Sequence, residues 1–564
     1  MKSIEDRRNA LRSRFTTWTS HTLDSWLDVC AAAYPDRPFV ITDDVTLTYG
    51  DVAEQSRVLA DALAALGVGP GDRVGMLMAN YPEFVPFKFA IARTGATAIP
   101  FNYLYRQEEL RYVLAQSRCS VLLTMTGFAK LDYLAMLDAI APGWESGPDH
   151  GALKQIVVLS TDGRTRANAM TYQDLFDLGD RHAGAADGLD HMPTDAGDML
   201  YTSGSTGSPK GVLVTHDAVL RTAYASALTR AYDESRRILF SLPCYHMFGY
   251  IEGLLSAMFV GGAVVLQTSF SAEGYFGAIE RHRVDDMLCV PTMAVALVES
   301  PSRDRYDLSS LSAIVCGSAP APIWLWEKVR SLFGVSETVT GYGSTECGGA
   351  MTLSLPEDPI VMISTTVGRP KLAGAAGAEG TDAVTVYSTV DPQTGRPLPA
   401  GEVGELVSRG PTTMLGYFDK PEETAAVLEE NGLLHSGDIG RVRSDGYIEL
   451  TGRTKELYKS GGELVMPKEV EDVLAAHDEI SQVFSIGLRD DRWGEIGCAV
   501  VVRTPGSTLT EEAVIGYCKE RLARFKVPKK VVFLDPAELP LTPTGKVQKF
   551  RLVDLVSRDP DQII

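Results

Sequence analysis

The sequence lacks paired cysteines. Its eight cysteines stand far apart, no two form a Cys-x-x-Cys pair, and none joins a cluster of histidines. Zinc sites and disulfide frameworks both need such groups at short or regular spacing. We therefore expect neither zinc nor disulfides, and thiols that are reduced and mostly buried. The cysteines are at positions 30, 119, 244, 289, 316, 347, 498 and 518.

Positive charge is in short supply. The chain has 53 Lys and Arg residues against 73 Asp and Glu residues, which gives a net charge of −20 at pH 7. Nucleic-acid surfaces are basic because binding neutralises phosphates, so no nucleic-acid partner is expected. Cations that meet an anionic ligand must instead be concentrated locally, as Lys210, Arg453 and Lys546 are predicted to be.

A long hydrophobic run is also missing. The longest apolar stretch, residues 253–266, is interrupted by Gly261 and Gly262 and is shorter than the ~20 residues of a membrane-spanning helix. The charged N-terminal residues are followed by no apolar segment of the signal-peptide type. The expectation is a cytoplasmic protein with no transmembrane segment.

The residues that are present suffice for a large globular protein. With 564 residues, 45% of them hydrophobic, the chain should form at least two domains. Between residues 52 and 125, expected helices alternate with expected strands, which is typical of a largely parallel α/β sheet. Residues 143–197 show weaker periodicity and are interpreted as a surface excursion. The expected helices are 52–66, 84–93 and 108–117, and the expected strands are 73–78, 96–100 and 120–125.

The character of the sequence changes near Gly452. Behind it we expect a small α+β unit of about 110 residues with its own core. Its elements are a helix over 468–477, strands over 482–487 and 498–503, a helix with Val514, Cys518 and Leu522 on one face, and a strand over 531–534.

Residues 201–211 read Tyr-Thr-Ser-Gly-Ser-Thr-Gly-Ser-Pro-Lys-Gly. Glycines let backbone N–H groups surround an anion, hydroxyls add hydrogen bonds, and Lys210 adds a positive charge. No Gly-Lys-Ser/Thr closes the loop, so it is not a Walker A sequence. Residues 211–214 resemble a strand, and Thr215 resembles the cap of a helix that begins near His216. The stretch predicts a phosphate-binding loop between two strands; a solvated Gly/Ser turn is the alternative.

Four further motifs follow this loop. They are Tyr342-Gly343-Ser344-Thr345-Glu346, Ser436-Gly437-Asp438, Gly452-Arg453-Thr454-Lys455 and Pro543-Thr544-Gly545-Lys546. In order and spacing, the series resembles the adenylate-forming superfamily, which comprises acyl-CoA synthetases, nonribosomal adenylation domains and beetle luciferase. The resemblance extends from about Thr48 to about Arg551. It implies an α/β fold with a large multi-layer adenylation domain, residues 1–454, and a small mobile α+β domain, residues 455–564, that carries a catalytic lysine.

The resemblance also implies ATP, Mg²⁺ and CoA as ligands. Tyr342 would stack on adenine, Thr345 would bond the α-phosphate and Glu346 would hold Mg²⁺, while Asp438 and Arg453 would bind the ribose. The phosphate-cradling set is Thr202, Ser203, Gly204, Ser205, Thr206, Gly207 and Lys210. The other implied cofactor-binding positions are Gly317, Ser318, Ala319, Pro320, Gly343, Lys455, Gly461 and Gly462.

The C-terminal part of the resemblance concerns the thioester step. Lys546 would bridge the substrate carboxylate and the α-phosphate, Lys455 matches the hinge between the domains, and Gly461 and Gly462 match a segment that lines the pantetheine tunnel. The sequence departs from its relatives directly afterwards, because residues 464–467 read Leu-Val-Met-Pro where an Asn and an aromatic residue commonly precede the proline.

His246 stands where the family places a residue beside the acyl carboxylate. Amino-acid-activating relatives carry an Asp near this point, whereas residues 241–251 contain no acid. The segment His-Met-Phe-Gly resembles fatty acyl-CoA synthetases; a buried structural histidine is the alternative. The implied catalytic set is therefore Lys546, Glu346, Thr345, His246 and Lys210.

These observations predict an acyl-CoA ligase that converts an apolar, fatty-type acid to an acyl-adenylate with ATP and then transfers the acyl group to CoA. The alternatives are an aryl or alicyclic acid CoA ligase, a stand-alone enzyme that loads a carrier-protein pantetheine, and a non-catalytic nucleotide-binding scaffold. The choice of acid, a luciferase-type oxygenation and a homodimer stay open at this point.

Overall fold

The computed structural model describes residues 2–147, 151–202, 209–318, 321–453, 456–460, 463–490, 494–541 and 547–557. Two compact units form: residues 1–386 with 408–434, and residues 387–407 with 435–564. The second unit begins upstream of residue 455 because strands that precede Gly452 pair within it. The boundary predicted at residues 454/455 separates the large domain from a domain that would reorient during the reaction. That boundary stays a prediction.

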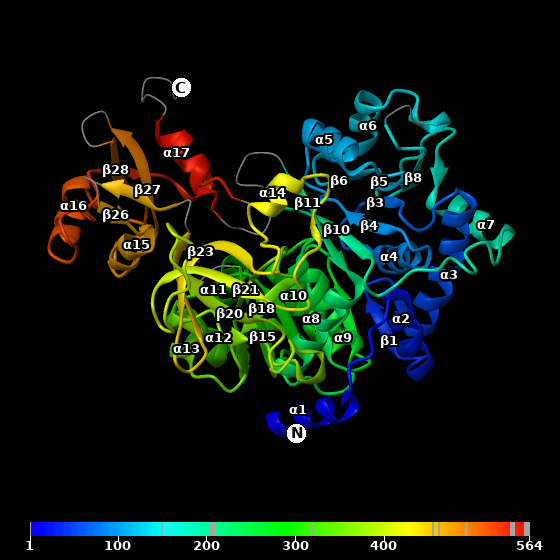
Figure 1. Cartoon of the computed structure of the whole chain (residues 1–564), viewed down its shortest axis with the longest axis horizontal. Coiled ribbons are helices and arrows are strands. Elements are labelled where there is room, and N and C mark those ends of the chain that lie inside the picture. The colour runs from blue at the N-terminus through cyan, green and yellow to red at the C-terminus, as the bar shows by residue number, and fades with distance from the viewer. Residues whose placement is uncertain are drawn as a thin grey trace. The chain divides into compact units, whose positions relative to one another are not determined.

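Two sheets form the framework of the first unit (Figure 1). One has eight strands in the order β22-β11-β10-β4-β3-β5-β8-β9, antiparallel only at β10–β11 and β11–β22. The other has seven in the order β16-β15-β14-β12-β13-β1-β2, antiparallel only at β1–β2. The strands are β1 (Pro38–Ile41), β2 (Thr46–Thr48), β3 (Arg73–Leu77), β4 (Thr97–Pro100), β5 (Val121–Met125), β8 (Gln155–Leu159), β9 (Met170–Thr171), β10 (Ala196–Thr202), β11 (Lys210–Thr215), β12 (Arg237–Phe240), β13 (Ala263–Leu266), β14 (Asp286–Cys289), β15 (Ala313–Cys316), β16 (Glu337–Val339) and β22 (Gly416–Tyr417).

Helices connect and cover these strands. Several begin at side-chain caps: Thr48 accepts from the Asp51 amide, and Thr215 accepts from the Ala218 amide at 3.1 Å. The α-helices of this unit are α1 (Ile4–Arg14), α2 (Leu23–Ala33), α3 (Tyr49–Ala65), α4 (Phe84–Arg93), α5 (Gln107–Ser117), α6 (Tyr133–Ile140), α7 (Tyr172–Arg181), α8 (His216–Thr229), α9 (Ser256–Met258), α10 (Ala272–His282), α11 (Pro291–Glu299), α12 (Ile323–Phe333), α13 (Ile360–Thr365) and α14 (Pro421–Ala425). The alternation predicted for residues 52–125 is confirmed.

The interpretation of residues 143–197 as a surface excursion is wrong in part. Strand β8 pairs with β5 and is buried at Ile156 and Val157. Helix α7 packs so closely on α3 that a Cβ at Gly179 would lie 2.0 Å from the Val58 carbonyl oxygen. The buried strand spans only five residues between polar segments, too few for periodicity to reveal it.

Smaller elements complete the first unit. Strands β17 (Gly341–Ser344), β18 (Gly349–Leu353) and β19 (Arg369–Pro370) form an antiparallel sheet, and β6 (Gly127–Phe128) pairs with β7 (Leu131–Asp132). A π-helix, η2 (Phe248–Leu255), follows His246. A Cβ at Gly253 would lie 2.4 Å from the Phe240 ring, so glycine allows η2 to pack on β12. π-Helical turns are rare and often occur at functional sites.

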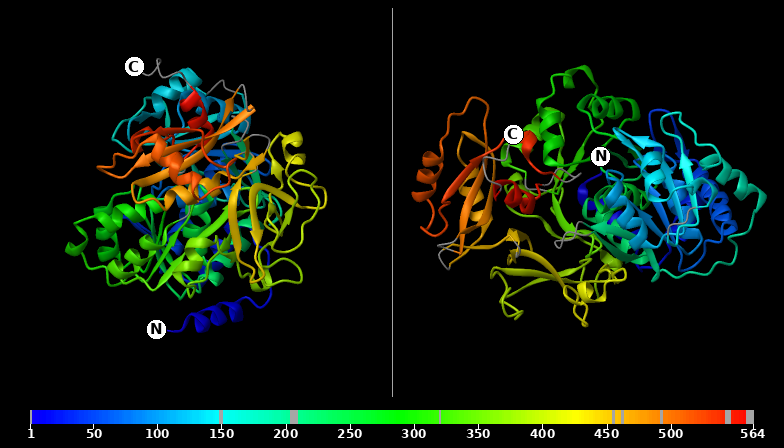
Figure 2. Two further views of the ribbon diagram at one scale, coloured as in Figure 1. Left: turned by 90° about the vertical axis from the view of Figure 1, so that its left-hand side faces the viewer. Right: turned by 90° about the horizontal axis from the view of Figure 1, so that it is seen from above.

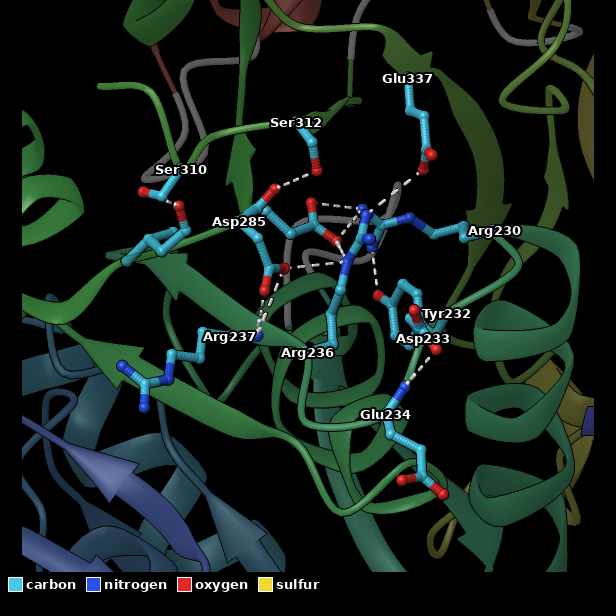
Figure 3. A network of polar contacts seen from close by, with 12 residues as sticks. Arg230, Tyr232, Asp233, Glu234, Arg236, Arg237, Asp285, Ser310, Ser312 and Glu337 are labelled. Atoms are coloured by element: carbon cyan, nitrogen blue, oxygen red, sulfur yellow. Dashed lines mark hydrogen bonds and ion pairs between the residues drawn. The ribbon is translucent and has the colours of Figure 1, made fainter. Parts of the chain in front are cut away.

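A buried network of charges supports the seven-stranded sheet (Figure 3). Both carboxylate oxygens of Asp286 accept from Arg230 at 2.6 Å, and one also accepts from Arg236 at 3.1 Å. Arg236 lies 3.5 Å from Glu337, which accepts a further bond from Arg7 on α1. The network therefore links α1 and the end of α8 to β14 and β16.

The second unit contains the four-stranded sheet β20-β21-β23-β24, the pair β25-β26 and the three-stranded sheet β27-β28-β29. Helices α15 and α16 cover one face of the three-stranded sheet and α17 covers the other (Figure 2). The elements expected behind Gly452 are found here with their own core. The bounds are β20 (Val386–Val390), β21 (Gly404–Arg409), β23 (Leu434–Val442), β24 (Ile448–Arg453), β25 (Tyr458–Ser460), β26 (Glu463–Val465), β27 (Ile480–Asp490), β28 (Gly494–Arg503), β29 (Lys530–Phe533), α15 (Pro467–Ala475), α16 (Glu511–Lys519) and α17 (Lys549–Ser557).

All eight cysteines are buried, as expected. Within the described ranges, none of the helices has the length and apolar character needed to cross a bilayer.

Candidate functional site

The rim of the predicted phosphate loop is formed by two paired strands. Thr202 ends β10, Lys210 begins β11, and the two residues are partners in the antiparallel ladder. This arrangement confirms a loop that joins two strands and is followed by a helix from His216. The Lys210 side chain is largely buried. Ser203, Gly204, Ser205, Thr206 and Gly207 lie outside the described residues.

Tyr417 connects the two charged residues predicted for this region. Its hydroxyl donates to Glu346 Oε1 at 2.9 Å, and the Lys210 ammonium lies 4.8 Å from the centre of its ring. Burial and the Glu346 carboxylate raise the pKa of Tyr417, so the hydroxyl keeps its proton. The sequence reasoning missed Tyr417, because only the pairing of β22 with β11 brings it to Lys210.

Strand β17 carries Tyr342 and Gly343, and the turn that joins it to β18 presents Thr345 and Glu346. A Cβ at Gly343 would lie 1.9 Å from the Gly349 carbonyl oxygen, so only glycine permits this pairing of β17 with β18. The Gly348 amide donates to the Thr345 carbonyl at 3.0 Å. Tyr342 is partly exposed, and its amide bonds Thr352 Oγ1 at 3.2 Å.

The turn after β15 lies beside η2 and β17. A Cβ at Gly317 would be 3.3 Å from the Phe248 ring and 4.0 Å from the Gly341 carbonyl oxygen. Ser318 has φ of 72°, a left-handed conformation that is uncommon for a non-glycine residue and often occurs at functional sites. Gly317 therefore lies near the start of β17, the strand that carries Tyr342. Ala319 and Pro320 lie outside the described residues.

His246 is held in one tautomer. The Phe248 amide donates to His246 Nδ1 at 3.1 Å, so Nδ1 is the acceptor and the neutral ring carries its proton on Nε2. Burial lowers the pKa of His246 to about 4. The imidazole is therefore neutral near pH 7, and Nε2 is a hydrogen-bond donor.

A mainly apolar face follows His246. A Cβ at Gly349 would make ordinary contacts of 3.7 Å with Thr222, Met247 and Ile251. Glycine at this position leaves room that a side chain would fill. The sequence pointed to Met247, which belongs to the His-Met-Phe-Gly segment, but not to Thr222 or Ile251, because the helices α8 and η2 meet only in the folded chain.

Two predicted ribose-binding residues are neighbours in the second unit. Asp438 on β23 and Arg453 on β24 are partners in the antiparallel ladder, with Arg453 Nε 2.8 Å from Asp438 Oδ1. Asp438 is buried, and its amide donates to Ser436 Oγ at 3.0 Å. Lys455, Gly461, Gly462 and Lys546 lie outside the described residues.

The donor set fits a Mg²⁺ ion that arrives with a nucleotide. Glu346 offers a partly exposed carboxylate, and Mg²⁺ typically takes one or two carboxylates together with phosphate oxygens and water. In the part of the chain that the structure describes, no group of three or more His, Cys, Asp or Glu residues could hold a metal ion. A cage built from protein ligands alone is therefore absent from those residues.

Comparisons with known proteins agree on one family. Residues 27–418 match the family model described as "AMP-binding enzyme", and residues 469–546 match "AMP-binding enzyme C-terminal domain". A 3-[(3aS,4S,7aS)-7a-methyl-1,5-dioxo-octahydro-1H-inden-4-yl]propanoyl:CoA ligase of Mycobacterium tuberculosis is 34% identical over 95% of this chain and 99% of its own. The mitochondrial medium-chain acyl-CoA ligase ACSF2 of Danio rerio is 30% identical over 94% of this chain and 88% of its own. ATP-bound MatB from Rhodopseudomonas palustris is similar in structure, with a TM-score of 0.80 and 25% identity over 94% of this chain and 98% of its own.

Proposed function

Since this chain belongs to the AMP-binding enzyme family, as an ATP-dependent acyl-CoA ligase that uses Mg²⁺, we propose that its substrate is an apolar carboxylic acid and that the residues above divide the reaction between them. The single observation that carries the proposal is the neutral His246 at the start of an apolar face formed by Met247, Ile251 and Gly349. Nothing in this face offers a charge to an α-ammonium group.

His246 would orient the acid. Its Nε2–H can donate to one carboxylate oxygen and leave the other oxygen to attack the α-phosphorus of ATP. A neutral donor positions the carboxylate without forming an ion pair that would lower its nucleophilicity. The protonation state of His246 would not change above about pH 5, because its pKa is about 4.

The phosphate side would stabilise the charge of the leaving pyrophosphate. Lys210 is buried beside Tyr417, where a positive charge acts more strongly on a phosphate oxygen than it would in water. Thr202 and the loop behind it would bond the β- and γ-phosphates, and Thr345 the α-phosphate. Mg²⁺ bound at Glu346 would neutralise phosphate charge.

The acid is proposed to be fatty or alicyclic. The relatives act on an indene-type propanoyl group and on medium-chain acyl groups, and the face at Gly349 accommodates apolar surface. CoA is the acceptor. A stand-alone carrier protein as an additional acceptor, a homodimer and a cytoplasmic location are retained as proposals.

A panel assay tests this function. Pyrophosphate release is measured with fatty, aryl, alicyclic and amino acids, with and without CoA, and the thioester is detected by mass. We expect CoA-dependent turnover of apolar acids and none of α-amino acids. Activation of any α-amino acid, or a thioester that forms only on a carrier protein, would contradict the proposal.

The domain assignment has its own test. We propose that residues 455–564 first present Lys546 for adenylation and then reorient about Lys455 for thioester formation. Lys546→Ala should slow adenylate formation by ~100-fold or more and spare the conversion of supplied acyl-adenylate. Lys455→Pro should do the reverse, because proline fixes φ at the hinge. Equal loss of both half-reactions in both variants would refute alternation.

A further inference from the structure

A buried ion pair stands on the elements that also form the apolar face, and the proposed adenylation steps do not use it. Lys371 Nζ donates to Glu252 Oε1 at 2.5 Å and to Ser226 Oγ at 2.6 Å. The Lys371 and Glu252 side chains are 0% and 1% exposed. Burial lowers the pKa of Lys371, and the Glu252 carboxylate opposes that shift. The pair is therefore isolated from water.

The pair has hydrogen-bonding capacity left over. Glu252 Oε2 is buried and has no hydrogen-bond partner among the described residues. Lys371 has two acceptors there, whereas an ammonium group has three hydrogens to donate. A buried carboxylate oxygen without a donor is unfavourable, and its persistence requires an explanation. One unused acceptor and one unused donor thus lie side by side.

The same elements carry the pair and the apolar face. Thr222 and Ser226 are four residues apart on α8, and such residues share one side of a helix. Ile251 directly precedes Glu252 on η2. The Lys371 amide donates to the Met351 carbonyl at 2.9 Å, which holds it against β18, the strand of Gly349. The pair and the Gly349 face therefore share α8, η2 and β18, and Glu252 follows His246 along the chain into η2.

We propose that Glu252 and Lys371 form the distal end of the acid-binding site and select an acid that carries a hydroxyl group far from its carboxylate. This inference rests on the proposed function, because it requires the acid to lie along η2 from His246. A hydroxyl group can donate to Glu252 Oε2 and accept from Lys371 at once. A ketone can only accept from Lys371, and an alkyl end leaves both groups unsatisfied.

Paired substrates test the proposal. kcat/KM is measured for ω-hydroxyalkanoic acids and for unsubstituted alkanoic acids of equal length, over a series from six to sixteen carbons. We expect the hydroxy acid to be favoured by ~10-fold or more at the length that reaches the pair, because a site built to bond a hydroxyl discriminates against an analogue that lacks one. In shorter acids the hydroxyl is buried before it reaches the pair, so the hydroxy acid should have a lower kcat/KM than the unsubstituted acid.

Variants separate recognition from a purely structural ion pair. Glu252→Leu combined with Lys371→Met removes both charges and should lower the hydroxy-to-alkyl ratio by ~100-fold. Glu252→Gln keeps the shape and should lower it several-fold, so the test survives if the double variant does not fold. The matched control is Lys88→Met with Asp198→Leu, a second buried pair at 3.0 Å that contacts η2 through the Tyr250 hydroxyl. The hydroxy-to-alkyl ratio of this control variant should match that of the wild type.

The outcomes distinguish the inference from the function beneath it. If unsubstituted acids are turned over with CoA but the hydroxy acid has no higher kcat/KM at any chain length, the distal-hydroxyl inference alone is overturned. A preference that keeps its wild-type size in Glu252→Gln or in the double variant, or that the control loses equally, would also overturn it. Failure of every acid in the series to give CoA-dependent pyrophosphate release would overturn the inference, and failure of the aryl and alicyclic acids of the panel as well would overturn the proposed function.

Discussion

The Tyr417 hydroxyl offers a direct test of how the magnesium side of the site is built. Tyr417→Phe removes the 2.9 Å bond to Glu346 Oε1 but keeps the ring beside Lys210. The change therefore affects the position of one carboxylate and leaves the environment of the phosphate-side lysine in place.

The expected loss can be worked from the geometry. A hydrogen bond to a charged group contributes ~1.5–3 kcal/mol. Glu346 is partly exposed, so water can replace the phenol in part, and the lower limit applies. About 1.4 kcal/mol corresponds to a factor of ten. Tyr417→Phe should lower kcat/KM for Mg-ATP by about tenfold and raise the Mg²⁺ concentration at half-maximal rate, with a smaller effect on the KM of the acid.

The assay is pyrophosphate release titrated separately with Mg²⁺, ATP and acid. Tyr417→Leu removes the ring as well, and the cation–π contact with buried Lys210 contributes a further ~1–2 kcal/mol, so this variant should be worse toward ATP. Tyr201→Phe is the matched control, because the Tyr201 hydroxyl donates to Gln116 and not to Glu346. If Tyr417→Phe stayed within twofold of the wild type, or changed the acid KM more than the ATP KM, Glu346 would not be positioned by Tyr417.

Three further predictions concern other parts of the chain. Burial lowers the pKa of His216 from 6.5 to about 3, so the unfolded state binds the proton more readily and the free energy of unfolding should fall by ~1.4 kcal/mol per pH unit below pH 6.5. In His216→Asn, the free energy of unfolding measured in urea between about pH 6 and pH 5 should depend less on pH; the same dependence as in the wild type would contradict this. Asp438→Ala should raise the KM of ATP by ~10-fold and that of the acid far less, because a charged hydrogen bond to the nucleotide is lost; equal effects in separate titrations would remove Asp438 from the nucleotide site. Asp286→Ala leaves Arg230 and Arg236 buried without their shared carboxylate and should lower the free energy of unfolding by ~3–5 kcal/mol; a loss under 1 kcal/mol in urea titration would show that the network of Figure 3 adds little to stability.

Local patterns predicted much of the fold. The helices and strands between residues 52 and 125 were predictable because Gly67 ends α3 and apolar residues repeat at helical spacing before it. Thr215 predicted the start of α8, since its side chain caps that helix directly. The short strand β8 was missed because its five residues carry no period of their own.

The same distinction, between what local sequence predicts and what it misses, applies to the candidate site. The phosphate loop, the Glu346 turn and the Asp438 strand are continuous motifs, and each could be recognised from neighbours in sequence. Their roles, and those of Lys455, Gly461, Gly462 and Lys546, stay predictions. The pairing of Asp438 with Arg453 follows from the register of β23 and β24, which the motifs did not reveal.

Contacts between distant residues were decided only by the tertiary structure. Tyr417 and Glu346 are 71 positions apart, and Lys371 and Glu252 are 119 apart. No periodic signal connects such residues; β22 must first pair with β11, and β19 with β18, before the side chains meet. The π-helical form of η2 likewise depends on packing, because Gly249 and Gly253 allow contact with β12 and the Leu242–Pro243 backbone that larger residues would prevent. Sequence alone therefore determined which chemical groups the enzyme has, and long-range packing decided which of them act together.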